Sequence, residues 1–138
     1  MITANRSLLY YGGAAVCTGL AGILHLMLVP NAISFNFINY AIFFLVSGIA
    51  QLFWVLPMIK RWGRIWYYIG IVGTIILIIM YAVTRVPGNP ITGRGGPINA
   101  MAIAIEVFQI SYIVLTSIII AIETRSTSQT IKDRRLNK

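Results

Sequence analysis

Apolar residues form four long runs along the chain, and the segments between and after these runs carry most of the charged residues and prolines. Each run approaches the length of about 20 residues that a helix needs to cross the hydrocarbon of a bilayer. The sequence therefore predicts an all-α protein, a bundle of four transmembrane helices. The predicted spans are residues 7–29, 37–58, 65–84 and 99–122.

The composition supports a membrane protein. Of the 138 residues, 58% are hydrophobic and 10% are charged, whereas soluble domains carry about 25% charged residues. A globule of this size has too little interior to bury so much apolar material, which must therefore face lipid. Residues 1–123 are predicted to form one membrane domain. Residues 124–138 form a basic polar tail without apolar periodicity, expected to be mobile or to lie on the inner leaflet.

The distribution of lysine and arginine predicts the orientation in the plasma membrane. Two of these residues, Arg85 and Arg94, lie on one side of the predicted spans, and nine lie on the other side with both termini. Because the basic side of a multi-pass protein faces the cytoplasm, both termini are predicted to be cytoplasmic. The net charge of +8 thus reflects topology, and lipid rather than nucleic acid is the expected partner. The nine residues are Arg6, Lys60, Arg61, Arg64, Arg125, Lys132, Arg134, Arg135 and Lys138.

Small residues line one face of the first predicted helix. Gly12, Ala15, Gly19 and Gly22 follow one another at spacings of three, four and three residues, which places them along one side of a helix. Lipid provides no hydrophobic drive for helices to associate, so close backbone approach at small residues matters. We expect a helix contact here, either with another helix of this chain or with a partner.

The predicted outer loop between the third and fourth helices is rich in proline and glycine, with Pro87, Gly88 and Pro90 near its start. Proline fixes φ and glycine permits positive φ, so such a segment favours a series of turns. We expect a shaped cap over the bundle, with a plain connector as the alternative.

Three ionisable residues are predicted at one depth in the outer leaflet. His25 lies near the end of the first span, Glu106 about two turns into the fourth, and Arg85 closes the third. Gln109 shares the helical face of Glu106. Ionisable groups within a membrane are costly and mark a candidate functional site. One interpretation is a structural ion pair between Arg85 and Glu106; the other is a pocket for a headgroup, a quinone or another ligand, or a proton relay.

The inventory of reactive residues is small. The chain has one cysteine, Cys17, one histidine and three acidic residues, whereas a metal site normally draws three or four ligands from these types. No nucleophile motif, phosphate-binding loop or haem-attachment motif occurs. We therefore expect no catalytic residues, no metal site and no cofactor bound by this chain alone.

Four short patterns resemble a widespread, uncharacterised family of small four-helix membrane proteins of prokaryotes. They are His25-x4-Pro30, Phe43-Phe44-x3-Gly48-x2-Gln51, Thr84-Arg85-x2-Gly88-x-Pro90, and Glu106 in the last span. In size, span count and isoleucine content the chain is also similar to small accessory subunits of archaeal membrane complexes such as ammonia monooxygenase.

Two functions are therefore expected. The first is a non-catalytic accessory or structural subunit of a larger membrane complex, which would contact other membrane subunits or further copies of itself. The alternative is a stand-alone binding or transport module for a small ligand, a lipid or protons, which would use an outer-leaflet pocket of His25, Arg85, Glu106 and Gln109.

Overall fold

The computed structural model describes residues 2–93 and 95–136, with side chains described in 7–93, 95–132 and 134–136. The described residues contain no strand and form four long helices, each apolar and long enough to cross a membrane. The predicted all-α class with four long apolar helices is thus confirmed. The helices are α1 (Ile2–Ser34), α2 (Ile38–Lys60), α3 (Arg64–Arg85) and α4 (Ala100–Leu136).

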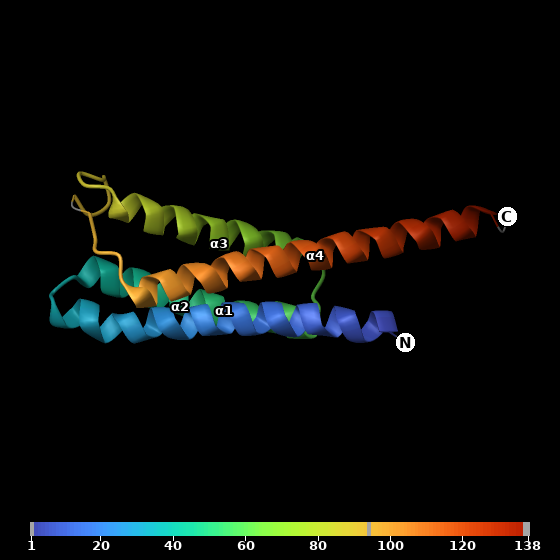
Figure 1. The fold of residues 1–138 in the computed structure, drawn as a ribbon, viewed down its shortest axis with the longest axis horizontal. Helices are drawn as coiled ribbons and strands as arrows, with labels where there is room; N and C mark the ends of the chain where they lie inside the picture. The colour runs from blue at the N-terminus through green and yellow to red at the C-terminus, as the bar shows by residue number, and fades with distance from the viewer. Residues whose placement is uncertain (1, 94, 137–138) are drawn as a thin grey trace.

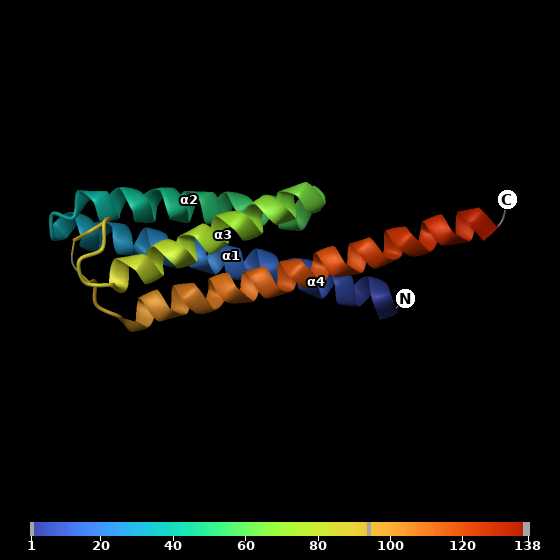
Figure 2. The same cartoon turned by 90° about the horizontal axis from the view of Figure 1, so that it is seen from above.

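The helices form an up-and-down bundle in which each contacts its neighbours in sequence. α1 packs along both α2 and α4, whereas α3 makes fewer contacts with α2 and α4 and lies on the opposite side of the bundle from α1 (Figure 1). Both termini lie at one end, which we call the terminal end, together with the α2–α3 turn. The α1–α2 turn and the α3–α4 loop lie at the other end, which we call the loop end (Figures 1 and 2).

The last helix is longer than the predicted span of residues 99–122 and includes most of the basic polar tail. α4 continues through residue 122 to Leu136 and projects beyond the α2–α3 turn (Figure 2). No glycine or proline follows Pro97 to stop it. Within this extension, the hydroxyl groups of Thr124, Thr127 and Ser128 donate to carbonyl oxygens four residues earlier, at 2.8 to 3.0 Å.

The first helix also extends beyond its predicted end. Its last residue is Ser34 rather than residue 29, and Pro30 lies inside it. Proline lacks the N–H that would bond four residues back, but the following amides still find helical carbonyls. The N–H of Phe35 bonds to the Asn31 carbonyl oxygen at 3.2 Å and that of Phe37 to the Ala32 carbonyl oxygen at 2.8 Å.

The outside of the bundle is apolar, unlike that of a soluble helical bundle, and polar as well as apolar side chains are buried between the helices. Large aliphatic residues cover the outside of all four helices, where they can face lipid, and a set of polar side chains is buried between the helices. The tightly packed apolar core lies in the half nearer the terminal end and centres on Tyr11, Met58, Tyr67, Tyr112 and Ile119. The buried polar residues are Thr18, His25, Ser47, Gln51, Thr74, Thr84, Asn89, Gln109 and Thr116.

The small-residue stripe of α1 is used largely within the chain. A β-carbon at Gly22 would lie 2.9 Å from the Gly48 carbonyl oxygen of α2, and one at Gly19 would lie 3.3 Å from Val55. Ala15 is buried, whereas Gly12 has no neighbour within 4 Å of a β-carbon. The sequence left open whether this stripe contacts another helix of the chain or a partner. In the structure it packs on α2 of the same chain, and only Gly12 has open space beside it among the four residues of the stripe.

Candidate functional site: a polar cavity at the loop end

A cavity of about 710 Å³ lies at the loop end and is lined by residues of all four helices and of the α3–α4 loop. Aromatic and aliphatic side chains form most of its wall. His25, Arg85 and Glu106 line it together, so the structure brings the three predicted ionisable residues to one site. The apolar part of the wall includes Leu28, Phe43, Phe44, Leu77, Met80, Tyr81 and Ile105.

The depth of these three residues follows from their helices. His25 is nine residues before the end of α1, Glu106 is six residues after the start of α4, and Arg85 is the last residue of α3. At about 1.5 Å per residue, the first two lie about 9 to 14 Å inside the bundle from its loop end. Arg85 lines the same cavity from the end of α3, closer to the loop.

His25 is held in one orientation. Its side chain is 4% exposed, and its Nδ1 lies 3.0 Å from the carbonyl oxygen of Ala21. A carbonyl oxygen only accepts hydrogen bonds, so Nδ1 carries a proton in this contact. The rings of Phe43 and Phe44 pack against the imidazole at centroid distances of 6.3 and 6.1 Å, and the Gln51 side chain is a further hydrogen-bond partner of the imidazole. The ring is therefore held in place by α1 and α2.

Arg85 does not form the ion pair with Glu106 that one interpretation of the sequence expected. Its Nη1 donates to the Pro97 carbonyl oxygen at 2.6 Å, and its guanidinium carbon lies 4.3 Å from the centroid of the Tyr81 ring. Within the described residues, the ion pair that forms is elsewhere, between Arg64 and Glu123. The α3–α4 loop folds over the guanidinium group and satisfies it with a backbone carbonyl, so Arg85 and Glu106 face the same cavity without pairing.

The loop is shaped by a residue that the sequence analysis did not single out. Asn89 is buried, and its side-chain oxygen accepts from the backbone amides of Ile91 and Thr92 at 3.0 and 2.8 Å. Its side-chain nitrogen donates to the Val86 carbonyl oxygen at 2.8 Å. An asparagine followed by proline is a turn signal, so Asn89-Pro90 could have identified it.

The predicted loop residues shape the cap without lining the cavity. Gly88 has a φ of 73°, which favours glycine, and both Pro87 and Pro90 are exposed. The cavity is lined instead by a later part of the loop, residues 91–92 and 95–97. A β-carbon on Gly96 would collide with Nη1 of Arg85, so glycine there lets the backbone close over the guanidinium group. Arg94 lies outside the described residues.

Gln109 lies deeper than the cavity, on the same face of α4 as Glu106. It is 1% exposed, and both polar atoms of its amide lack a hydrogen-bond partner among the described residues. The side-chain oxygen of Gln51 and the hydroxyls of Tyr67 and Tyr112 share this condition. Gln51 and Gln109 thus make the layer beneath the cavity polar, whereas Tyr67 and Tyr112 belong to the apolar core.

Replacement of Gln109 by leucine is therefore expected to stabilise the protein. A buried amide without partners costs about 1–3 kcal/mol, and leucine has a similar volume, so the free energy of unfolding should rise by about 1–2 kcal/mol. Denaturation in mixed detergent micelles would measure it. Gln129→Leu, on the exposed end of α4, is the control and should change little. A loss of stability in Gln109→Leu would contradict the prediction.

The cavity offers two side chains of the common metal-binding types, His25 and Glu106. The described residues contain no group of three or more histidine, cysteine, aspartate and glutamate side chains that could hold a metal ion. Cys17 lies on α1, partly buried against the apolar core and away from the cavity. The cavity can therefore bind a ligand through hydrogen bonds and charge interactions with a few polar side chains, and through contacts with its apolar wall.

Comparisons of the chain with protein-family models, with curated proteins and with solved structures found no match.

Proposed function

We propose that this chain is a plasma-membrane protein with cytoplasmic termini that binds a small amphiphile in the loop-end cavity, which would open in the outer leaflet. The basic residues of the α2–α3 turn and of the α4 extension support this orientation. The observation that carries the proposal is the convergence of His25, Arg85 and Glu106 on one cavity with apolar walls. Binding sites commonly combine such walls with a few oriented polar groups.

The polar groups favour a ligand whose head both accepts and donates hydrogen bonds. Arg85 supplies donors, including an Nε that is buried without a partner among the described residues. His25 supplies an imidazole ring that lines the cavity, and Glu106 supplies a carboxyl group, which accepts hydrogen bonds when ionised and can also donate one when protonated. Phe43, Phe44 and Tyr81 surround these groups with aromatic surface. A quinone or quinol with an apolar tail fits this pattern, because its ring can pack on aromatic side chains and its oxygens can both accept and donate.

Thermal unfolding in detergent with a short-chain quinone, its quinol and a fatty acid tests the proposal. A ligand that binds the folded state stabilises it by mass action. We expect the quinone or the quinol to raise the unfolding temperature. We expect Arg85→Gln to weaken binding about 10- to 100-fold, because a hydrogen bond to a charged group contributes about 1.5–3 kcal/mol.

Matched variants make this result specific. Glu106→Gln should also weaken binding, whereas Arg125→Gln, at an exposed position outside the cavity, should not. Equal stabilisation of the wild type and Arg85→Gln by every ligand, or stabilisation by none of them, would overturn the proposal.

A second candidate function is that of an accessory subunit in a larger membrane complex, and the exposure of α3 favours it. Four residues of α3 are buried, namely Tyr67, Gly70, Thr74 and Thr84, and Gly73 has no neighbour within 4 Å of a β-carbon. A partner helix could pack on this open side. Isolation in mild detergent with mass spectrometry tests this role, because an accessory subunit would copurify with larger subunits in fixed proportion. The motif resemblance to small four-helix prokaryotic proteins is compatible with either role.

A further inference from the structure

A second cavity lies at the terminal end, on the opposite side of the apolar core from the first. It has a volume of about 370 Å³ and lies where the α2–α3 turn meets the beginning of α1 and the middle of α4. Two arginines, Arg61 and Arg64, and one carboxylate, Glu123, line it together with several hydroxyl groups and two isoleucines. The charged lining has a net positive charge, which favours an anionic ligand.

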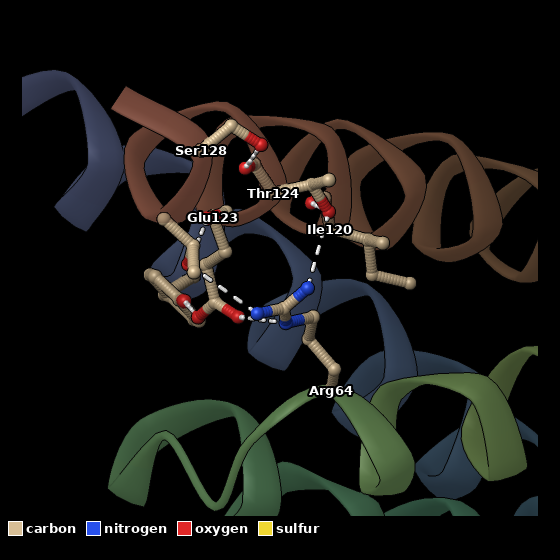
Figure 3. A network of polar contacts seen from close by, with 7 residues as sticks. Arg64, Ile120, Glu123, Thr124 and Ser128 are labelled. Atoms are coloured by element: carbon tan, nitrogen blue, oxygen red, sulfur yellow. Dashed lines mark hydrogen bonds and ion pairs between the residues drawn. The ribbon is translucent and has the colours of Figure 1, made fainter. Parts of the chain in front are cut away.

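Arg64 reaches across the cavity from α3 to α4 (Figure 3). Its Nε lies 4.0 Å from Oε2 of Glu123, and its two terminal nitrogens donate to Thr124 and Thr127 at 3.5 and 3.3 Å. Charge-assisted bonds of arginine to an anion are normally about 2.7–2.9 Å long. Glu123 also accepts a hydrogen bond from the Tyr11 hydroxyl. Arg64 is thus positioned by long, weak contacts that leave its donors able to bind a stronger acceptor.

Arg61 enters the cavity in an unusual backbone conformation. It is the C-cap of α2 with a φ of 51°, in the left-handed region, where a residue with a β-carbon is disfavoured and glycine or asparagine is usual. Its guanidinium carbon lies 4.6 Å from the centroid of the Tyr11 ring. No carboxylate pairs with Arg61 among the described residues. The second positive charge of the cavity is therefore uncompensated.

Aromatic residues place this cavity at the level of a membrane surface. Trp62 lies in the α2–α3 turn and Trp66 at the beginning of α3, with ring centroids 4.9 Å apart. The indole nitrogen of Trp54 donates to the Trp66 carbonyl oxygen at 3.2 Å. Tryptophan concentrates at the boundary between lipid and water. Ile119 and Ile122 supply apolar lining beside the two arginines. Charge and apolar surface thus meet at the depth of lipid phosphates.

We propose that the terminal-end cavity binds a phosphate group, and that an anionic phospholipid of the adjacent leaflet carries it. Arg61 and Arg64 bind the phosphate oxygens, the hydroxyls of Ser126 and Thr127 lie beside it, and the isoleucines contact the glycerol and the first part of the acyl chains. This site is separate from the loop-end cavity and does not depend on the function proposed for it.

The test compares lipid binding by variants in nanodiscs. Wild-type protein in phosphatidylcholine nanodiscs should unfold at a higher temperature when phosphatidylglycerol is included, and should retain phosphatidylglycerol in native mass spectrometry. Arg61→Asn should weaken this binding about tenfold, because one charge-assisted contact is lost. Asparagine suits the left-handed conformation, so this variant should be at least as stable as the wild type in phosphatidylcholine alone.

Two control experiments distinguish phospholipid binding in this cavity from attraction to general surface charge and from binding of free phosphate. Arg125→Gln removes one positive charge from α4 outside the cavity and should leave phosphatidylglycerol binding unchanged. An equal loss of binding in Arg125→Gln and Arg61→Asn would overturn the proposal, as would an unaltered affinity in Arg61→Asn. If inorganic phosphate, added without anionic lipid, stabilised the wild type as strongly as phosphatidylglycerol, a lipid source would be excluded.

Discussion

Replacement of Gly22 by valine is expected to lower the free energy of unfolding by about 2–3 kcal/mol, because it overpacks a close backbone contact between α1 and α2. A β-carbon at this position would lie 2.9 Å from the Gly48 carbonyl oxygen and 3.1 Å from the Leu52 backbone nitrogen. Both are backbone atoms, which cannot rotate away as a side chain can. The two helices would have to separate, and Thr18 of α1 would lose its 3.0 Å hydrogen bond to the Gln51 carbonyl oxygen.

Unfolding in mixed micelles, followed by tryptophan fluorescence, would measure this loss. Gly12→Val is the matched control, because Gly12 lies on the same helix with no neighbour within 4 Å of a β-carbon. It should change the stability by no more than about 0.5 kcal/mol. Similar losses in both variants would show that valine acts through the helix itself, and the proposed close contact would then be wrong.

Replacement of Gly70 by valine is the other substitution with a large expected effect. A β-carbon there would collide with the indole nitrogen of Trp54 and with the hydroxyl of Tyr112. Because α3 contacts the bundle less than the other helices do, this clash should push α3 outward and cost about 3 kcal/mol. The displaced helix also carries Tyr81 and Arg85, so binding at the loop-end cavity should weaken as well.

The control for this second substitution lies one turn further along α3. Gly73→Val adds the same side chain where no atom lies within 4 Å of a β-carbon, and it should preserve both stability and ligand binding. Tryptophan emission gives an independent readout, because Gly70→Val should expose Trp54 and shift its spectrum to the red. An unshifted spectrum with wild-type stability would contradict the packing described for α3.

These two positions mark close contacts between helices, in a bundle that has a packed core at one end and a cavity at the other. Gly22 and Gly70 permit close approach of α1 to α2 and of α3 to both of its neighbours, and the apolar core occupies the terminal half. At the loop end, α3 is held by the hydrogen bond of Arg85 to Pro97 and by the bond of the Gly96 amide to the Thr84 carbonyl oxygen at 2.9 Å. The cavity lies between the apolar core and these hydrogen bonds of the loop.

Much of the loop-end site could be predicted from local features of the chain. The rise of a helix is constant, so the positions of His25 and Glu106 within their spans determine their depth once the spans are recognised. The positions of Gln109 and of the small-residue stripe on their helical faces follow from the same periodicity. Tyr81 could not be found in this way, since an aromatic residue in a span is equally typical of lipid contact.

The terminal-end cavity was beyond sequence analysis for a related reason. Arg61 and Arg64 were counted as topology signals, and Glu123 was placed at the boundary between membrane domain and tail. Their meeting requires α4 to remain helical past residue 122, which the polar composition of that segment did not indicate. It also requires the left-handed turn at Arg61, which directs this side chain towards Tyr11.

The sequence by itself determined the all-α class, the number of helices long and apolar enough to cross a membrane, and the position of each ionisable residue along its helix. Apolar run length and helical rise are local properties that need no knowledge of neighbouring segments. Only the tertiary structure decided which groups meet: Arg85 with the Pro97 carbonyl oxygen rather than Glu106, Gly22 with α2, and Arg64 with Glu123. Such pairings depend on how each helix is rotated about its axis and on the path of the loops. Both are set by contacts between residues far apart in the chain.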